Sequence, residues 1–451
     1  MENNIQNHYF APTTPMNMKF FNKPLTYVCS FLLSLLLATA GTSQGFDRIE
    51  RARMKDMLKM VKAEIKDKYY DPTYHGIDLE ARFKQAEEKL AQANSTTQSI
   101  AIIAQVLVDF NDSHLFFIPP PTNLAVEYGW RMQAIGDKVF ITQVKPGSDA
   151  EAKGLKIGDQ VVSIGGFRPS KKELWKVRYY YNVVGKRSSV LLSVLNPGQT
   201  SPRDLEINSE TKRLPQKITF STYFRLFDDF YDEENDKNRF VTSGGITIWK
   251  MPSFAIDPGS LEGFIGRAKG GGLILDLRRN GGGYVESMER LVGSVFDKDI
   301  KVAELKGRKK MDPSIAKTRG ANIFKGKLIV LIDSESASAS EIFARVVQME
   351  ARGRVLGDVS AGAVMQSIQY AQEMGSDSVV PFAVSITNAD VIMSDGKSLE
   401  HVGVTPDEQV VPSGADLAAG RDPVLARAVE LLGGKLSAEE AGKLFKYYWK
   451  K

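Results

Sequence analysis

Cysteine and histidine are scarce in this sequence. Its 451 residues include one cysteine, Cys29, and four histidines, at positions 8, 75, 114 and 401. A single thiol excludes internal disulfides and a cysteine-based zinc site. The histidines follow no metal-binding spacing, so we expect no metal ion and no cofactor.

The chain also lacks any dense run of one charge. It has 59 basic and 54 acidic residues, giving a formal net charge of +5. This balance gives no sign of a nucleic-acid partner. The hydrophobic fraction of 43% and the charged fraction of 25% are typical of a globular protein. The length is sufficient for two or three domains.

One apolar stretch, residues 25–40 (LTYVCSFLLSLLLATA), is shorter than the roughly 20 residues that span a membrane. Lys19 and Lys23 precede it and small residues follow it, a pattern typical of a Sec signal peptide. We therefore expect residues 1–43 to be a signal peptide with an upstream extension, and the protein to be exported. Its removal would take away Cys29 and any thiol nucleophile. Membrane contact would need an uncleaved segment.

Four further patterns predict the organisation of the rest. Apolar residues recur at three and four spacing over 46–110, predicting two helical segments with a break at residues 71–74. Short strands and turns are indicated from about 126 to 207. From 244 to 411 short apolar runs alternate with helical patterns, which indicates an α/β core. Residues 423–432 and 438–448 predict two amphipathic helices.

Two segments of the α/β core carry candidate chemistry. Residues 331–341 (LIDSESASASE) join an apolar strand to a helix rich in serine and alanine at its start. Free N–H groups at a helix N-terminus can stabilise an anion. Residues 275–284 (LDLRRNGGGY) run from a buried strand into three glycines, which permit close backbone approach to a substrate carbonyl. Each segment alone also fits a simple structural role, an N-cap cluster with Glu341 or a tight turn.

Taken together, the two segments resemble the core of the tail-specific, or carboxyl-terminal processing, proteases. The resemblance continues through Gly357-Asp358 and residues 399–407 (LEHVGVTPD). It implies that Ser338 is the nucleophile of a serine peptidase and that residues 243–412 form a crotonase-like α/β fold. It also implies a polypeptide substrate and a bacterial protein of the periplasm or cell exterior.

An upstream segment fits the same family. Residues 144–166 (VKPGSDAEAKGLKIGDQVVSIGG) resemble the central signature of a PDZ domain, which binds peptides by strand addition. Tyr128, Gly129 and Trp130 occupy the position of its carboxylate-binding loop, although they match that loop poorly. The expected organisation is a signal segment at 1–43, an N-terminal helical domain at 44–121, a PDZ-like domain at 124–209, a connecting segment at 210–242, the catalytic core at 243–412 and C-terminal helices at 413–451.

The general base departs from the family pattern. A serine hydroxyl needs a neighbouring base, and the lysine that tail-specific proteases use is replaced here by Ala363. Residues 111–115 (NDSHL) instead resemble the Ser-His pair of the tricorn protease branch. That resemblance makes His114 the base, with Ser113 beside it and Glu400 as the orienting carboxylate. The oxyanion would lie between the N–H of Ala339 and that of Gly282 or Gly283.

Several alternatives remain open at this level. His114 could be a histidine packed at a domain junction, and His401 or Lys397 could serve as another base. Ala363 also makes a catalytically inactive member of the fold credible, one that binds peptides or lipophilic ligands. A PDZ-based scaffold is a further possibility. The sequence does not indicate cleavage specificity or oligomeric state.

Overall fold

The computed structural model describes residues 48–122, 124–213, 235, 237–268, 271–375 and 379–449. These residues belong to one compact unit, Thr42–Lys451. The predicted signal peptide and most of the predicted connecting segment lie outside the described residues. Within the described part, no helix is long and apolar enough to cross a membrane.

The N-terminal region contains three helices, α2 (Arg48–Lys68), α3 (Leu79–Gln92) and α4 (Thr96–Val108). The prediction of two helical segments was therefore wrong. The missed boundary lies at Ser95, whose side chain accepts a hydrogen bond from the N–H of Gln98 and caps α4. The helix α3 thus ends at Gln92, and α4 begins at Thr96 directly after the Ser95 cap.

The predicted PDZ-like domain contains a five-stranded antiparallel sheet in the order β3-β4-β5-β6-β7. Its strands are β3 (Trp130–Ile135), β4 (Lys138–Val144), β5 (Gln160–Ile164), β6 (Ser189–Leu195) and β7 (Arg203–Asn208). The helix α6 (Leu174–Tyr179) and a separate pair, β2 (Leu124–Glu127) with β8 (Glu210–Arg213), complete it. The strand β3 is an edge strand of this sheet.

The C-terminal half contains the predicted α/β core. Its sheet has the order β18-β15-β14-β11-β10-β9, and all neighbours except β9 and β10 pair in parallel. The strands are β9 (Arg239–Ser243), β10 (Ile246–Lys250), β11 (Gly272–Asp276), β14 (Lys327–Ile332), β15 (Arg354–Gly357) and β18 (Glu408–Gln409).

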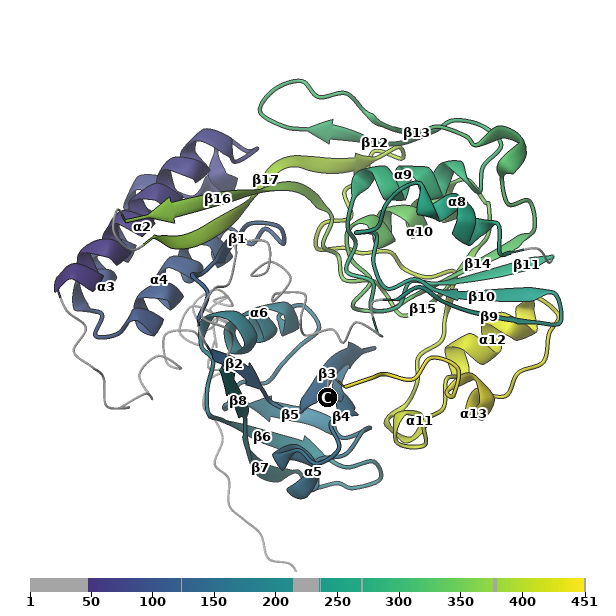
Figure 1. Cartoon of the computed structure of the whole chain (residues 1–451), viewed down its shortest axis with the longest axis horizontal. Coiled ribbons are helices and arrows are strands. Elements are labelled where there is room, and N and C mark those ends of the chain that lie inside the picture. The colour runs from purple at the N-terminus through teal and green to yellow at the C-terminus, as the bar shows by residue number, and fades with distance from the viewer. Residues whose placement is uncertain are drawn as a thin grey trace, which may run out of the picture. The chain divides into compact units, whose positions relative to one another are not determined.

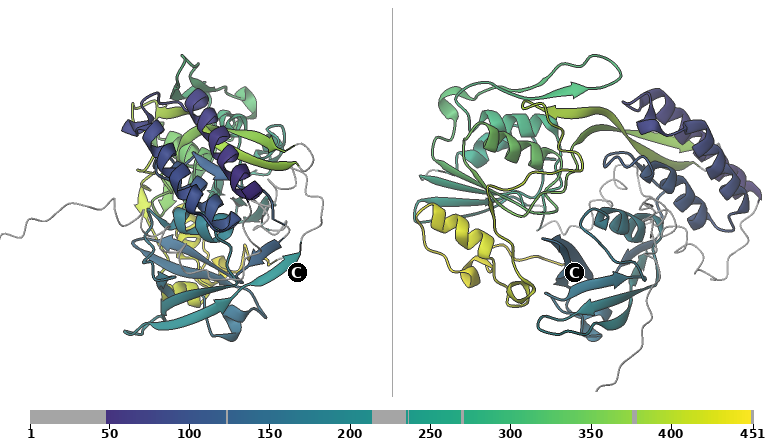
Figure 2. Two further views of the ribbon diagram at one scale, coloured as in Figure 1. Left: turned by 90° about the vertical axis from the view of Figure 1, so that its left-hand side faces the viewer. Right: turned by 180° about the vertical axis from the view of Figure 1, so that it is seen from behind.

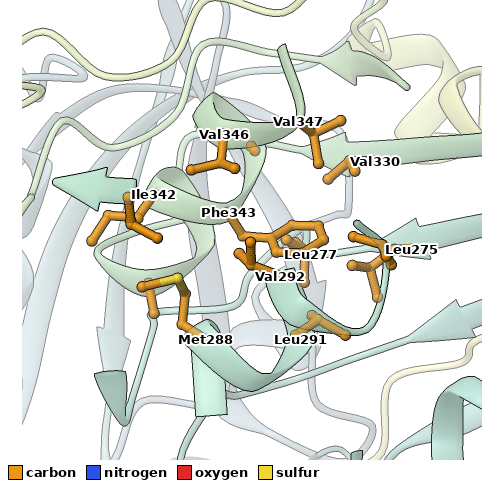
Figure 3. Packing of buried hydrophobic residues seen from close by; sticks show 14 of the residues in the cluster. Leu275, Leu277, Met288, Leu291, Val292, Val330, Ile342, Phe343, Val346 and Val347 are labelled. Atoms are coloured by element: carbon orange, nitrogen blue, oxygen red, sulfur yellow. The ribbon is translucent and has the colours of Figure 1, made fainter. Parts of the chain in front are cut away.

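Helices cover both faces of this sheet, as a parallel sheet requires. Leu275 and Val330 pack against α9 (Val285–Gly293) and α10 (Ala339–Met349) on one face (Figure 3). The neighbouring side chain Ile274 points to the other face, where α12 (Pro423–Leu431) supplies Val424 and Leu425. The alternation follows from the two-residue period of a strand.

The C-terminal region differs from the prediction. The helix α12 is present, but α13 covers only Ala438–Ala441, so the second predicted helix was wrong beyond that point. Gly442 follows α13, and its Cα lies so close to the Gly420 carbonyl that a Cβ would meet it at 1.8 Å. Beyond Gly442 the backbone forms a turn and then irregular structure, in which Tyr447 and Tyr448 bond to Arg131 and Asn235.

A second sheet connects the N-terminal region to the core. It contains β1 (Phe116–Ile118), β12 (Ile300–Lys306), β13 (Ser314–Ala316), β16 (Met365–Met374) and β17 (Val380–Met393). The long strand β17 pairs with β1 near one end and with β12 near the other. Figures 1 and 2 show β16 and β17 lying along α2. This pairing carries residues 109–115, which precede β1, to the core.

A substitution at Phe343 can test the packing of the core. Its side chain lies on α10, is fully buried and faces β11 and α9 (Figure 3). Phe343→Ala should lower the free energy of unfolding by about 4 kcal/mol, because it removes buried area and leaves a cavity. Urea denaturation measures this. Ile49→Ala, at a side chain that is 69% exposed on α2, is the control and should change stability by less than about 0.5 kcal/mol. Equal effects of the two substitutions would contradict the packing described.

Candidate active site

The candidate site lies where three parallel strands end. Asp276 of β11 pairs with Leu331 of β14, and Ile332 of β14 pairs with Gly357 of β15. The loops that follow these strands are therefore adjacent, as is usual for sites at the carboxyl ends of parallel strands. They contain the glycine turn, the Ser338 turn and residues 358–364.

Ser338 lies in a strained turn between β14 and α10. Its φ is 54° and its ψ is −118°, a conformation that L-residues with a side chain rarely adopt. The turn is fixed on both sides, since the Ala337 N–H donates to the Asn280 carbonyl and the Ser338 N–H to the Ala363 carbonyl, at 3.0 and 2.9 Å. Among the described residues, Ser338 Oγ donates no hydrogen bond. The backbone thus holds this hydroxyl in place while leaving it available.

The glycine turn packs directly against this serine. A Cβ on Gly282 would lie 2.7 Å from Ser338 Cβ, so only glycine fits there. The Gly282 N–H donates to the side chain of buried Asn280 at 2.9 Å. The Gly282 N–H therefore already has an acceptor, and its predicted part in an oxyanion site stays a prediction. The N–H groups of Gly283 and Ala339 have no acceptor among the described residues, so they are the pair left for an anion.

Ser113, His114 and Glu400 are hydrogen-bonded to one another. Ser113 Oγ donates to Glu400 Oε2 at 2.9 Å and lies 2.8 Å from His114 Nδ1. The Ser113 N–H donates to the other oxygen of Glu400, and the Val364 N–H also donates to this carboxylate. Since the Ser113 proton goes to Glu400, His114 Nδ1 must donate to Ser113 Oγ. Its Nε2 then carries the lone pair, which is the tautomer that a general base requires.

Further groups orient His114. Its backbone N–H donates to Asp112 Oδ1 at 2.9 Å, and buried Asp112 also accepts from Tyr69 and Thr387. Burial lowers the pKa of His114, against the opposing effect of Glu400 and Asp112, so the ring is neutral at neutral pH. Tyr69 lies 45 positions before His114 and was not predicted, because no local motif marks it.

The serine and the histidine are linked through one loop but not directly. The Ser338 N–H is bonded to Ala363, and the next residue, Val364, is bonded to Glu400. Within the described residues, no hydrogen bond joins Ser338 Oγ to His114. Catalytic hydrogen bonds often tighten only in the substrate complex.

Glu341 is a second residue whose full role was not predicted from the sequence. The sequence suggested only a capping role, but the buried carboxylate accepts four hydrogen bonds, from the N–H groups of Ser338, Gly362 and Ala363 and from the Ser360 hydroxyl. It therefore joins the Ser338 turn to the loop where the family lysine would lie. Burial outweighs these hydrogen bonds and raises the pKa of Glu341 to about 7.

Within the part of the chain that the structure describes, no lysine is seen to replace the one missing at position 363. Lys397 is exposed, and its backbone N–H donates to Asp395. Three lysines with a pKa lowered by burial are already bound: Lys171 to the Val359 carbonyl, Lys186 to Thr122 and Lys250 to Asp276. His401 is engaged as well, because its Nε2 lies 2.6 Å from the Asn111 carbonyl oxygen.

The predicted peptide-binding residues lie at the start of β3. The Tyr128 hydroxyl donates to the Tyr181 carbonyl and its ring is buried, while the Gly129 carbonyl accepts from the Lys145 N–H. Trp130 begins the edge strand. Met132 and Ala134 on this strand have carbonyls that accept from Arg178 and Ser334, so part of the edge is already bonded.

Glu341 gives a pH-dependence with a defined sign. Its pKa is raised from 4.5 to about 7, so as the pH rises the unfolded chain ionises this group before the folded chain does. The contribution of Glu341 to the free energy of unfolding is complete below 4.5 and should fall by on the order of 3 kcal/mol as the pH passes 7. The measurement is the stability of the unmodified chain minus that of Glu341→Gln, by urea unfolding across this interval. Glu350→Gln, at the end of the same helix, is the control. A difference that stays flat or rises would sink the assignment.

Sequence comparison gives matches over the α/β core and over the predicted PDZ-like domain. Residues 245–410 match the profile of peptidase family S41, and residues 126–174 match that of the PDZ domain. The chain is 27% identical over 350 residues to a tail-specific protease of Haemophilus influenzae, covering 73% of this chain and 47% of that protein. It is 24% identical over 362 residues to the carboxy-terminal processing protease CtpB of Bacillus subtilis, covering 79% of this chain and 68% of that protein. The match thus spans about half to two thirds of these relatives.

A solved structure supports the same relationship at the level of the fold. Mature CPAF aligns with a TM-score of 0.62 and 13% identity, covering 82% of this chain and 94% of that chain. The predicted resemblance to the tail-specific proteases is confirmed by these findings. Through residues 245–410, preceded by the match to a PDZ domain, the chain is similar to peptidase family S41.

Proposed function

We propose that this protein is a serine endopeptidase that hydrolyses peptide bonds of polypeptide substrates through an acyl-enzyme, in some cases near their C-termini. The observation that carries the proposal is the Ser338 turn. There, within the described residues, a strained serine whose hydroxyl donates no hydrogen bond adjoins two N–H groups without an acceptor. Such an arrangement can bind the oxyanion of acyl transfer. The polypeptide substrate class is supported by the protease relatives.

The proposed reaction uses the chain's own residues at every step. Ser338 Oγ attacks the peptide carbonyl carbon while its proton passes to His114 Nε2. The oxygen of the tetrahedral intermediate is received by the N–H groups of Gly283 and Ala339. His114 then returns the proton to the leaving amine, and a water molecule repeats the sequence to release the acid. Glu400, through Ser113, stabilises the imidazolium between these steps.

Two finer features belong to this proposal. We propose that the α/β region is crotonase-like, which is supported by its parallel sheet with helices on both faces. The base assignment to His114 rests on the hydrogen-bonded group with Ser113 and Glu400 and on the alanine at position 363. That alanine equally favours a catalytically inactive member of the fold that binds peptides or lipophilic ligands.

Fluorophosphonate labelling separates an active from an inactive serine. The probe should label the unmodified chain at Ser338, and Ser338→Ala should abolish labelling and peptide hydrolysis. His114→Ala should lower kcat by about 10⁴-fold, since the serine loses its proton acceptor. Ser260→Ala, a serine of α8 (Ser260–Ile265) outside the turn, is the matched control. No labelling of a folded unmodified chain would favour the inactive alternative, and full activity of His114→Ala would exclude the histidine as base.

We also propose that the protein is exported to the periplasm or cell exterior of a bacterium, on the strength of residues 1–43. The expected result is a mature form that begins near residue 44 in the envelope or medium fraction. N-terminal sequencing of the purified protein measures this. Replacing two leucines of the apolar stretch with arginine should keep the chain in the cytoplasm. An intact N-terminus in the cytoplasmic fraction of unmodified cells would contradict export.

A further inference from the structure

The segment Lys446–Trp449 follows the last helix without forming a helix or strand, and it is held by residues from three distant parts of the chain. The Lys446 carbonyl accepts from Arg239 at 2.8 Å. The Tyr448 backbone pairs with the Asn235 side chain through both its N–H and its carbonyl, at 3.0 and 2.7 Å. Figure 1 shows this end of the chain beside β3 and β4. The segment is therefore bound like an extended peptide.

The Tyr447 side chain lies against two arginines. Its hydroxyl accepts from Arg131 Nη1 at 3.0 Å, and its ring centroid is 5.5 Å from the Arg131 guanidinium and 5.0 Å from that of Arg279. The Trp449 ring packs edge-on against Tyr447 at 5.2 Å. Guanidinium groups near an aromatic ring attract its π-electrons. Arg131 and Arg279 are referred to below as the arginine clamp.

The clamp is connected to the Ser338 turn through Glu335. Arg279 Nε lies 3.5 Å from Glu335 Oε2, and Arg178 also forms an ion pair with this carboxylate. Burial opposes ionisation of Glu335, but the charges of Arg178, Arg279 and Arg131 outweigh it and lower its pKa. Arg178 and Arg279 thus share the carboxylate of Glu335, three residues before Ser338. Guanidinium groups held in this way suit a ligand with an aromatic ring or carbonyl groups.

The clamp also lies between the two predicted substrate-contacting regions. Arg131 follows Trp130 on the edge strand β3, next to the predicted peptide-binding residues. Arg279 lies four residues before Gly283 in the glycine turn. The clamp thus takes one arginine from each of the two predicted substrate-contacting regions, and both arginines contact the same Tyr447 ring.

We propose that the arginine clamp is a binding site for an aromatic side chain, tyrosine above all, of an extended polypeptide, and that Tyr447 fills it in cis as a competitor of such segments. The role of the clamp as a substrate subsite rests on the proposed peptidase function. Its role as a peptide-binding site does not depend on that function. The occupant in the described structure is residues 446–449 of this chain.

The competition has a predictable size. A segment tethered by a short linker acts at an effective concentration in the millimolar range. If residues 446–449 bind the clamp with a dissociation constant on the order of 100 μM, they reduce the apparent affinity of a competing peptide by about tenfold. Removing the tethered segment should therefore raise the apparent affinity of the competing peptide by about tenfold.

The test is binding of a fluorescent hexapeptide with the sequence of residues 446–451 (KYYWKK) to the otherwise full chain carrying Ser338→Ala, which prevents turnover. Fluorescence anisotropy should show about tenfold tighter binding to a chain lacking residues 446–451 than to one that retains them. Tyr447→Ala should give a gain in the same direction in case the deletion does not fold. Arg131→Ala in the deleted chain should lose the gain, and a peptide with alanine in the position of Tyr447 should bind weakly to every variant.

Tyr448→Ala is the matched control, because its half-exposed ring makes no aromatic or cation–π contact among the described residues and its backbone contacts to Asn235 remain. It should bind the peptide like the chain that retains residues 446–451. Equal binding to the retained, Tyr447→Ala and Tyr448→Ala chains would overturn the proposal. Because this measurement needs no catalysis, it gives the same answer whether or not the chain is a peptidase. A rise in kcat/KM of Tyr447→Ala on a tyrosine-containing peptide would then identify the clamp as a substrate subsite.

Discussion

The Glu341 carboxylate is the constraint on which the candidate site depends. It joins the N-terminus of α10 to the loop at residues 360–363 through four hydrogen bonds. Two backbone bonds cross the same gap, from the Ser338 N–H to the Ala363 carbonyl and from the Ala361 N–H to the Ser336 carbonyl. Since a buried carboxylate without these donors would be strongly disfavoured, the two loops must remain together for it to be ionised. The strained Ser338 backbone is therefore fixed by an interaction that is itself sensitive to pH.

The same loop connects this serine to the second half of the site. Val364 lies one residue beyond Ala363 and donates to Glu400, which in turn accepts from Ser113. The pairing of β1 with β17 then determines where His114 lies, because it fixes the chain just after that residue. Under the proposed mechanism the base comes from the N-terminal region, and position 363 of the core is an alanine. The proposed chemistry therefore depends on how the pairing of β1 with β17 places residues 109–115.

Two partly buried arginines connect the core to the C-terminal region. Arg278 forms paired hydrogen bonds with Asp276 of β11 and with Asp422, which caps α12. It therefore joins the C-terminal helices to the strand that leads into the glycine turn. The adjacent Arg279 instead faces Glu335 and Tyr447. Two neighbouring side chains thus connect the same turn to the C-terminal region at two points, which explains why that region lies against the core rather than apart from it.

The sequence alone determined the family resemblance, the α/β class of the core and the identity of the serine turn. These follow from local patterns, namely apolar runs, a glycine triplet and a small-residue helix start, whose spacing is visible in one dimension. Predictions from the sequence were wrong where a side-chain contact determines the end of a helix. The Ser95 cap divided a helical pattern, and the aromatic contacts of Tyr447 replaced a predicted helix.

Only the tertiary structure decided which N–H groups of the glycine turn are unpaired, because that depends on the Asn280 side chain folding back onto Gly282. It also decided that Glu341 and Tyr69 support the site, since their partners lie 19 to 43 positions away in the chain. Hydrogen bonds between distant residues leave no periodic trace in a single sequence. The folded backbone alone brings them together.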